Sequence, residues 1–197
     1  MQAPFRNLLL FSFAKSLVFV VELCNHAAEN FAKNRPDQVS LIEGAVSLNG
    51  RPHIHDGRLW AAYRGMSVSS DILASALISL DERLLIEQKT QPELVNQALK
   101  HLLDQGTSSF TTSVVASLMM AHPSLVTEKM LGVFKCPWFF VDDFSRCQQE
   151  PLALAIHGGH DGLDSERQKE RIASNNLPHR RYNLEDLALQ LQLSRLD

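Results

Sequence analysis

The stretch from Gly57 to Gln88 constrains the fold most, because it holds the most regular amphipathic pattern in the chain. It begins with GRLWAAYRG, in which Trp60 and Tyr63 share one face of a helix. Gly65 then ends that helix, since glycine accepts the left-handed dihedral angles of a C-terminal cap. Apolar residues follow at helical spacing: Ile72, Leu73, Ala76, Leu77, Leu80, Leu84 and Leu85. The stretch therefore predicts a short helix and then a longer one that buries a single stripe.

That stripe is expected to contain no ionisable group. Asp81, Glu82 and Arg83 are assigned to the solvent side of the longer helix, and Ser69, Ser70 and Asp71 supply candidates for its N-terminal cap. The pattern thus predicts one helix that packs against its neighbours by an apolar face.

The segment Leu8–Leu23 is rich in apolar residues. Lys15 lies in its middle and Glu22 near its end, and its uninterrupted apolar runs are far shorter than the ~20 residues that cross a bilayer. We therefore expect neither a signal peptide nor a membrane span. The segment instead predicts one helix from about Phe5 to about Lys33, buried by other helices on nearly all sides.

An extended excursion is predicted between about Gln38 and Ile54. Val39 and Leu41 alternate with polar residues, and Val46 and Leu48 extend the alternation. Asn49-Gly50 is a strong tight-turn dipeptide. The segment therefore predicts a small β-hairpin within an otherwise helical chain.

The remainder of the chain predicts further helices. Short links between consecutive helices imply antiparallel neighbours. A HEAT-like stack of helix pairs and a plain irregular bundle both fit, and we favour the stack. The expected fold is mainly α, a single domain over residues 1–197, with the array mainly in 57–150 and charged C-terminal helices in 164–197.

Local signals place some of these helices. Thr90 and Glu93 have capping-box spacing, Ser124 is expected to open a helix that ends before Pro137, and Trp138–Arg146 predicts a short helix or turn. Asn183 caps a terminal helix.

Composition excludes some classes of protein. The chain has 197 residues, 45% hydrophobic and 21% charged, with a net charge of −3, which is ordinary for a globular protein and provides no overall attraction to nucleic acid. The three cysteines form no CxxC pair and follow no secretory signal. We therefore expect a reducing, cytoplasmic location, with the thiols acting as small core residues.

Two histidine pairs are the candidate metal ligands. His53 and His55 alternate on an extended segment, so both imidazoles can face one ion. His157 and His160 form a second pair in a glycine-rich turn. Together with Asp142 or Asp143 they can make a four-ligand or catalytic site. Neither pair matches a specific metalloenzyme signature, so we expect no metal and no other cofactor.

Two further groups are candidate binding residues. Arg180, Arg181 and His179 form a basic cluster before the last helix that can bind phosphate. Arg180 and Arg181, together with the charged helix before them, can bind nucleic acid. We favour a solvated cluster paired with Glu185 and Asp186 and expect no nucleic-acid binding, because the net charge is negative. The second group is Trp60, Tyr63 and Arg64, which forms either a packed junction between the hairpin and the array, the interpretation we favour, or the edge of a binding face.

Several segments in fixed order resemble the helical-repeat region of very large bacterial ATP-binding proteins of the NACHT/STAND type. These segments are FRNLLLFSFAKSLVFVVELCNHA, RLWAAYRG, SALISLDERLL, SVVASLMMAHPSLV, WFFVDDFSR and NLPHRRYNLEDLALQLQL. The resemblance implies a helical array used for sensing or contact in signalling or defence against phage. It also implies a detached fragment or stand-alone relative, of a kind carried on a mobile element. The chain has neither GxxxxGK[ST] nor GxGxxG, so ATP hydrolysis is not implied for it.

These observations predict a non-enzymatic scaffold or protein-interaction domain with an unidentified protein partner. A detached array exposes faces that neighbouring repeats would cover, and large apolar patches promote association; we therefore expect a homodimer. The alternative is a metal-dependent hydrolase built on the two histidine pairs. No GxSxG elbow or recognisable cysteine nucleophile points to another class of enzyme.

Overall fold

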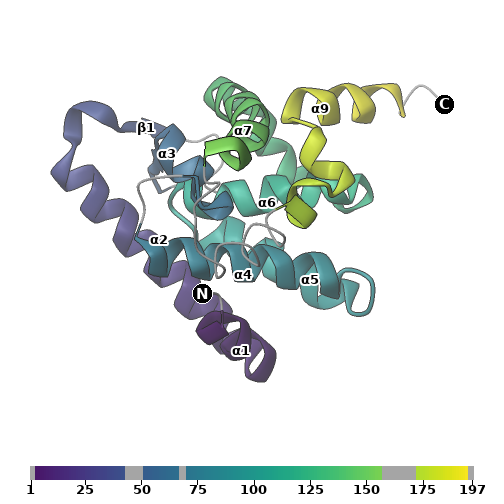
Figure 1. The fold of residues 1–197 in the computed structure, drawn as a ribbon, viewed down its shortest axis with the longest axis horizontal. Helices are drawn as coiled ribbons and strands as arrows, with labels where there is room; N and C mark the ends of the chain where they lie inside the picture. The colour runs from purple at the N-terminus through teal and green to yellow at the C-terminus, as the bar shows by residue number, and fades with distance from the viewer. Residues whose placement is uncertain (1–2, 43–50, 67–69, 157–171, 195–197) are drawn as a thin grey trace.

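The fold is mainly α-helical with one small antiparallel sheet, as predicted (Figure 1). A computed structural model describes residues 3–42, 51–66, 70–156 and 172–194. In chain order the elements are α1 (Ala3–Phe11), α2 (Phe13–Asn34), the 3-10 helix η1 (Pro36–Gln38), β1 (Ser40–Ile42), β2 (His53–His55), α3 (Gly57–Trp60), η2 (Ala61–Arg64), α4 (Asp71–Glu87), α5 (Pro92–Gln105), α6 (Ser109–Ala121), η3 (Pro123–Leu125), η4 (Glu128–Lys135), α7 (Pro137–Ile156), η5 (Pro178–Arg181) and α9 (Leu184–Leu193).

The N-terminal region forms two helices, so the prediction of one helix from Phe5 to Lys33 is wrong. The chain turns sharply at Ser12, whose φ is −151° and ψ 69°. Phe5 then stacks on Phe19, with ring centroids 6.4 Å apart. The turn allows α1 to pack against α4 as well as α2, which buries Leu9 completely.

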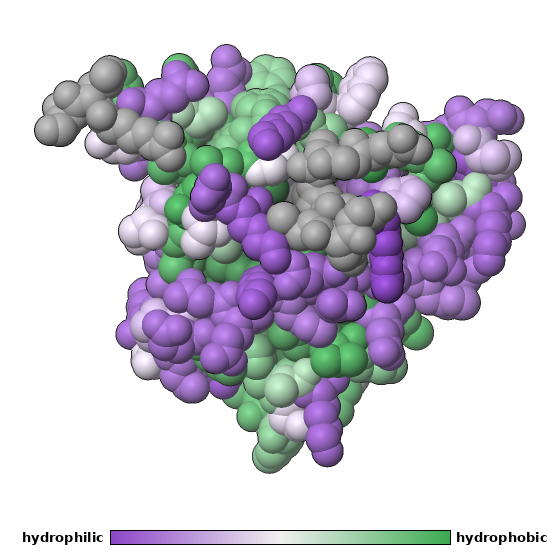
Figure 2. Space-filling model, turned by 180° about the vertical axis from the view of Figure 1, so that it is seen from behind, coloured by the Kyte–Doolittle hydropathy of each residue, from purple (hydrophilic) through white to green (hydrophobic). Residues whose placement is uncertain are grey.

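The predicted burial on nearly all sides is also wrong. Large apolar side chains of α1 and α2 remain exposed: Leu8, Leu10, Phe11, Val18 and Phe19. Figure 2 shows hydrophobic surface on the projecting lower end of the molecule, where α1 lies.

The strand pair lies where the hairpin was predicted. β1 and β2 are antiparallel, with Leu41 opposite Ile54. The predicted Asn49-Gly50 turn lies outside the described residues. Ile54 also donates its backbone N–H to the carbonyl of Thr107 at 2.8 Å, so β2 is joined to the start of α6.

Within Gly57–Gln88, the first helix ends and the second begins where the sequence pattern predicts. Gly65 has a φ of +63° and ends η2 in the left-handed region. Ser70 caps α4 by accepting the N–H of Leu73 at 3.3 Å. Within α4, Asp81 is buried, which corrects the expectation that the stripe contains no ionisable group.

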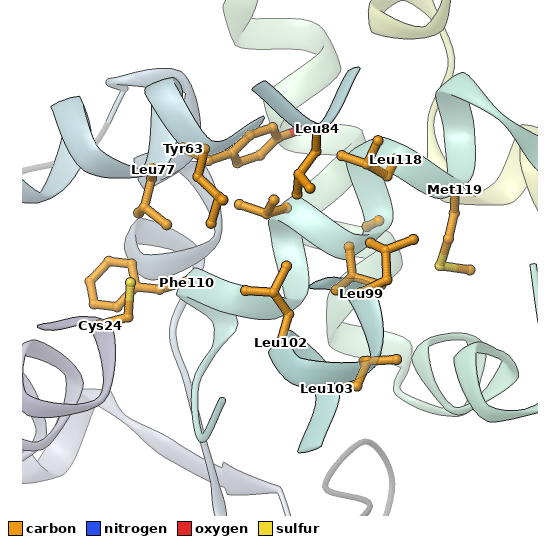
Figure 3. Close-up of a cluster of buried hydrophobic side chains, with 14 of the residues drawn as sticks. Cys24, Tyr63, Leu77, Leu84, Leu99, Leu102, Leu103, Phe110, Leu118 and Met119 are labelled. Carbon is orange, nitrogen blue, oxygen red and sulfur yellow. The ribbon is translucent and has the colours of Figure 1, made fainter. Parts of the chain in front are cut away.

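Helix α6 lies at the centre of the molecule. Every residue from Ser109 to Met120 is buried, and α6 packs against α3, α4, α5 and α9. Figure 3 shows side chains from α2, η2, α4 and α5 surrounding Phe110, Leu118 and Met119 of this helix. The sequence SFTTSVVASLMMA allows such enclosure because its polar residues are small and several hydroxyls bond to backbone carbonyls within the helix. This enclosure favours the irregular bundle; regular HEAT-like stacking remains a prediction.

Several helix boundaries differ from the expectations. The helix expected from Ser124 forms 3-10 turns, η3 and η4. The short helix expected over Trp138–Arg146 is part of α7, which continues to Ile156. No capping box forms at Thr90, whose hydroxyl donates to Glu87 instead. The cap at Asn183 is confirmed and forms a full capping box with Asp186.

Within the described part of the chain, no helix is both long and apolar enough to cross a bilayer. The three cysteines are free thiols. Cys24 and Cys136 belong to the buried core, as expected, whereas Cys147 is only half-buried and lies outside it.

Candidate functional site

The two histidines of β2 share an aromatic neighbour. The rings of His53 and His55 lie edge-on to Phe139 of α7, with centroids 5.8 and 5.4 Å away. Trp60 stacks on the same ring at 4.9 Å. The alternation of the strand therefore brings both imidazoles to Phe139, which is apolar and supplies no metal ligand.

Apart from Phe139, the two histidines contact two hydroxyl groups and one carboxyl group. The Nε2 of His53 lies 3.3 Å from the hydroxyl of Thr112, and the Nδ1 of His55 lies 2.9 Å from that of Ser109. The Nε2 of His55 lies 3.2 Å from Asp142. No group of three or more His, Cys, Asp or Glu side chains suited to a metal occurs among the described residues. His157 and His160 lie outside them, so the second half of the predicted site stays a prediction.

Burial shifts the pKa values of His53, His55 and Asp142. It lowers the pKa of His53 to about 3, helped by the nearby His55. It also lowers the pKa of His55, which Asp56 opposes. Burial raises the pKa of Asp142 to about 6, and the charges of Asp56 and Asp143 add to the rise. His53 is therefore neutral at pH 7 and acts as a buried hydrogen-bonding group.

Ser109, His55 and Asp142 form a chain of the residue types used by serine hydrolases. The serine is fully buried, with 0% of its surface exposed. A nucleophile must reach a substrate carbonyl, and no substrate can contact this hydroxyl in the folded protein. The chain of contacts therefore joins β2, α6 and α7, and we assign it a structural role.

A network of buried charges centres on α7. Arg146 donates from Nε to Asp143 at 2.7 Å and lies 3.3 Å from Glu150. Arg64 of η2 bonds to the other oxygen of Glu150 at 2.5 Å. Trp60 donates its indole N–H to Asp143 at 3.2 Å. Burial alone would lower the pKa of Arg146, but Tyr63 and Asp143 outweigh it and raise that pKa.

The C-terminal segment completes this network. Asp143 accepts the backbone N–H of Leu184 at 3.0 Å. Arg146 donates to the carbonyls of Arg180 and Tyr182. The charges of α7 therefore anchor η5 and the start of α9 to the core.

The two arginines before the last helix have different surroundings. Arg180 is 3% exposed; it pairs with Asp81 and lies 5.3 Å from the centre of the Tyr63 ring. The expectation of a solvated cluster paired with Glu185 and Asp186 is therefore wrong for Arg180. Arg181 is exposed and is the only one of the two that presents its side chain at the surface.

Trp60, Tyr63 and Arg64 are also buried. They connect the hairpin region to α6 and α7, which is the packed junction favoured by the sequence. Burial raises the pKa of Tyr63 to about 12, so the phenol stays protonated near neutral pH. In this conformation none of the three lies on an exposed face.

An open groove of about 1250 Å³ lies between the C-terminal ends of α4 and α6 on one side and η5 and α9 on the other. We call it the α9 groove. Its lining includes five of the large apolar side chains that are exposed to solvent: Ile86, Leu177, Tyr182, Leu189 and Leu193. The groove has no local signal in the sequence, because its walls come from segments that lie far apart along the chain.

Three basic side chains line one part of the α9 groove. They are Lys89, His122 and His179. Burial lowers the pKa of His179 to about 4, and the charge of Arg180 adds to the effect. Burial lowers the pKa of His122, and the charge of Lys89 lowers it further. His179 is 8% exposed, and its Nε2 has no hydrogen-bond partner among the described residues.

A local signal for the charged network was present in the sequence. Phe139, Asp143, Arg146 and Glu150 recur at intervals of four, three and four residues, which places them on one helix face. Asp81 likewise lies four residues after Leu77 and three before Leu84, both in the buried stripe. Their partners Arg64 and Arg180 lie far away in sequence, so local patterns do not reveal the pairs.

Comparison with known proteins identifies no family: no protein-family model matches the chain, and no curated protein matches it.

Proposed function

We propose that this protein is a non-enzymatic, helical protein-interaction domain and that the α9 groove binds its partner. The observation that carries the proposal is the concentration of exposed apolar side chains along the groove. Soluble proteins rarely expose contiguous apolar surface without a binding role. The resemblance to helical-repeat regions of NACHT/STAND-type proteins supports the same kind of function.

The dimensions and charges of the groove favour an amphipathic helix as ligand. Small-molecule pockets are commonly 300–1,000 Å³ and enclose most of the ligand, whereas this groove is larger and open. An apolar trough between helices is the usual receptor for the apolar face of a helix. Glu82 and Asp186 line it along with one lysine, Lys89, so the preferred helix carries Lys or Arg beside its apolar face.

The hydrolase alternative receives less support. Of the two histidine pairs on which it depends, the structure describes His53 and His55, and both rings pack on Phe139. Ser109 beside them is inaccessible. A metal site would therefore require His157 and His160 to act with groups other than this pair.

Selection from a displayed library of amphipathic helical peptides tests the proposal. Peptides of about 16 residues, more than four turns, are selected on the wild-type protein. Their affinities are then measured for L189E/L193E and for V141E, a matched variant at an exposed apolar position of α7. We expect the wild type and V141E to bind cationic amphipathic peptides equally, and L189E/L193E to bind at least tenfold more weakly.

Two outcomes contradict the proposal. One is the absence of any enriched amphipathic sequence on the wild-type protein. The other is equal peptide affinity for L189E/L193E and the wild type, with unchanged circular dichroism for both.

A further inference from the structure

The outward face of α2 carries an apolar centre between two opposite charges. Residues 15, 18, 19, 22 and 26 are exposed, whereas Leu17, Val20, Val21, Cys24 and Ala28 on the opposite side are buried. Val18 is 42% exposed and Phe19 50%. Figure 1 shows α2 along one edge of the molecule, with its outer side uncovered.

The charges on this face have a symmetric arrangement. Lys15 and Glu22 lie seven residues apart, so they occupy the same face about 10 Å from each other along the axis. Neither forms an ion pair with another residue in the described part of the chain. The midpoint between them falls between Val18 and Phe19.

We propose that this face pairs with the same face of a second copy of the chain, the two α2 helices running antiparallel about a two-fold axis. Antiparallel pairing centred between Val18 and Phe19 brings Lys15 of each copy opposite Glu22 of the other. It also places Val18 of each copy against Phe19 of the other. The surface is therefore self-complementary in both charge and apolar contact, as a two-fold interface requires.

The turn between α1 and α2 extends this interface. The turn places Phe11 beside the N-terminal end of α2, and in the antiparallel pair the C-terminal half of the second copy's α2 passes that end. Phe11 is 90% exposed and adjoins the half-exposed Leu8 and Leu10. Pairing thus covers apolar side chains that the single chain leaves in water. This interface shares no lining residue with the α9 groove and does not depend on the proposed function of the groove.

Analytical ultracentrifugation between about 1 and about 100 μM tests the pairing, because dimerisation depends on concentration. We expect the wild type to approach twice the 22.1 kDa chain mass. K15E and E22K each convert two attractive contacts per dimer into repulsive ones, so each should raise the dissociation constant about tenfold or more. The double variant K15E/E22K restores opposite charges and should recover most of the wild-type affinity.

The control variant is K100E, which makes the same charge change on an exposed position of α5 and should leave the dissociation constant unchanged. V18E should give a monomer with a melting temperature close to that of the wild type, since Val18 is exposed and lies outside the buried core cluster. A wild type that stays monomeric at the highest concentration would overturn the proposal. So would a dimer that K15E and V18E leave intact.

Discussion

Asp81 and Arg180 illustrate how one residue pair connects distant parts of this chain. Both side chains are almost fully buried, and 99 residues separate them in sequence. Removing charges from water is costly, so such a pair contributes little net stability compared with apolar residues. Removal of one partner leaves the other charge buried and unpaired.

We therefore predict unequal effects for single and double substitutions of this pair. D81L and R180M should each destabilise the protein by about 3–5 kcal/mol, whereas D81L/R180M should be less destabilised than either single variant. Urea unfolding followed by circular dichroism measures the three free energies of unfolding. Additive losses in the double variant would contradict the account, because independent sites add and coupled sites do not.

At the scale of the secondary-structure element, the burial of β2 determines the protonation state of His53. His53 stays neutral in the folded protein because its pKa falls from 6.5 to about 3. In the unfolded chain the same imidazole takes up a proton below pH 6.5. The unfolded state therefore binds more protons between about pH 6.5 and pH 3, and acidification through this window destabilises the fold.

The stability of the wild type should consequently fall on acidification by about 2 kcal/mol at pH 5 from His53 alone. Asp142 acts in the opposite direction: its pKa rises from 3.8 to about 6 on folding, so the folded state gains a proton between these values. Thermal and urea unfolding from pH 7.5 to 5 should show a smaller loss for H53Q than for the wild type. Parallel pH profiles for the two proteins would refute the assignment.

The same element scale shows which features can be predicted from the sequence. The starts of α4 and α5 follow from Ser70 and Pro92, because an N-cap and a proline in the first turn act within one turn of helix. The turn at Ser12 has no such local signal; it lets α1 pack against α4 and buries Leu9. Apolar burial of this kind depends on tertiary contacts, which periodicity does not encode.

The candidate sites were predictable only in part for the same reason. Alternation correctly placed His53 and His55 on one side of a strand, but Phe139, which both rings contact, comes from more than 80 residues away. The basic cluster was visible in sequence as charge, whereas the burial of Arg180 depends on Asp81. The α9 groove requires the tertiary arrangement of α4, α6 and α9.

At the scale of the whole molecule, the C-terminal segment is an integral part of the core. Leu184 and Leu187 belong to the buried cluster, and Arg180 neutralises Asp81. The resemblance to a repeat array suggested units that contact only their neighbours. In this molecule residues 172–194 instead contact elements from several parts of the chain.

Deletion of residues 177–197 should therefore abolish cooperative unfolding of the remaining chain. It removes two core leucines and leaves Asp81 without its partner, and the combined loss is comparable with the whole stability of a domain. Differential scanning calorimetry measures the transition, and a synthetic peptide of residues 177–194 added back should restore part of it. A truncated chain that melts cooperatively at the wild-type temperature would show that the segment is dispensable.

The long-range charge pairs also determine when the molecule can fold during synthesis. Helix α6 emerges from the ribosome well before η5 and α9, both of which pack against it. Until Arg180 has been made, Asp81 lacks its charged partner in the interior, and the apolar surface under η5 and α9 stays open. Native contacts of such high sequence separation slow folding and prolong the exposure of apolar surface. Until η5 and α9 have been made, the nascent chain therefore exposes apolar surface of the kind that promotes aggregation.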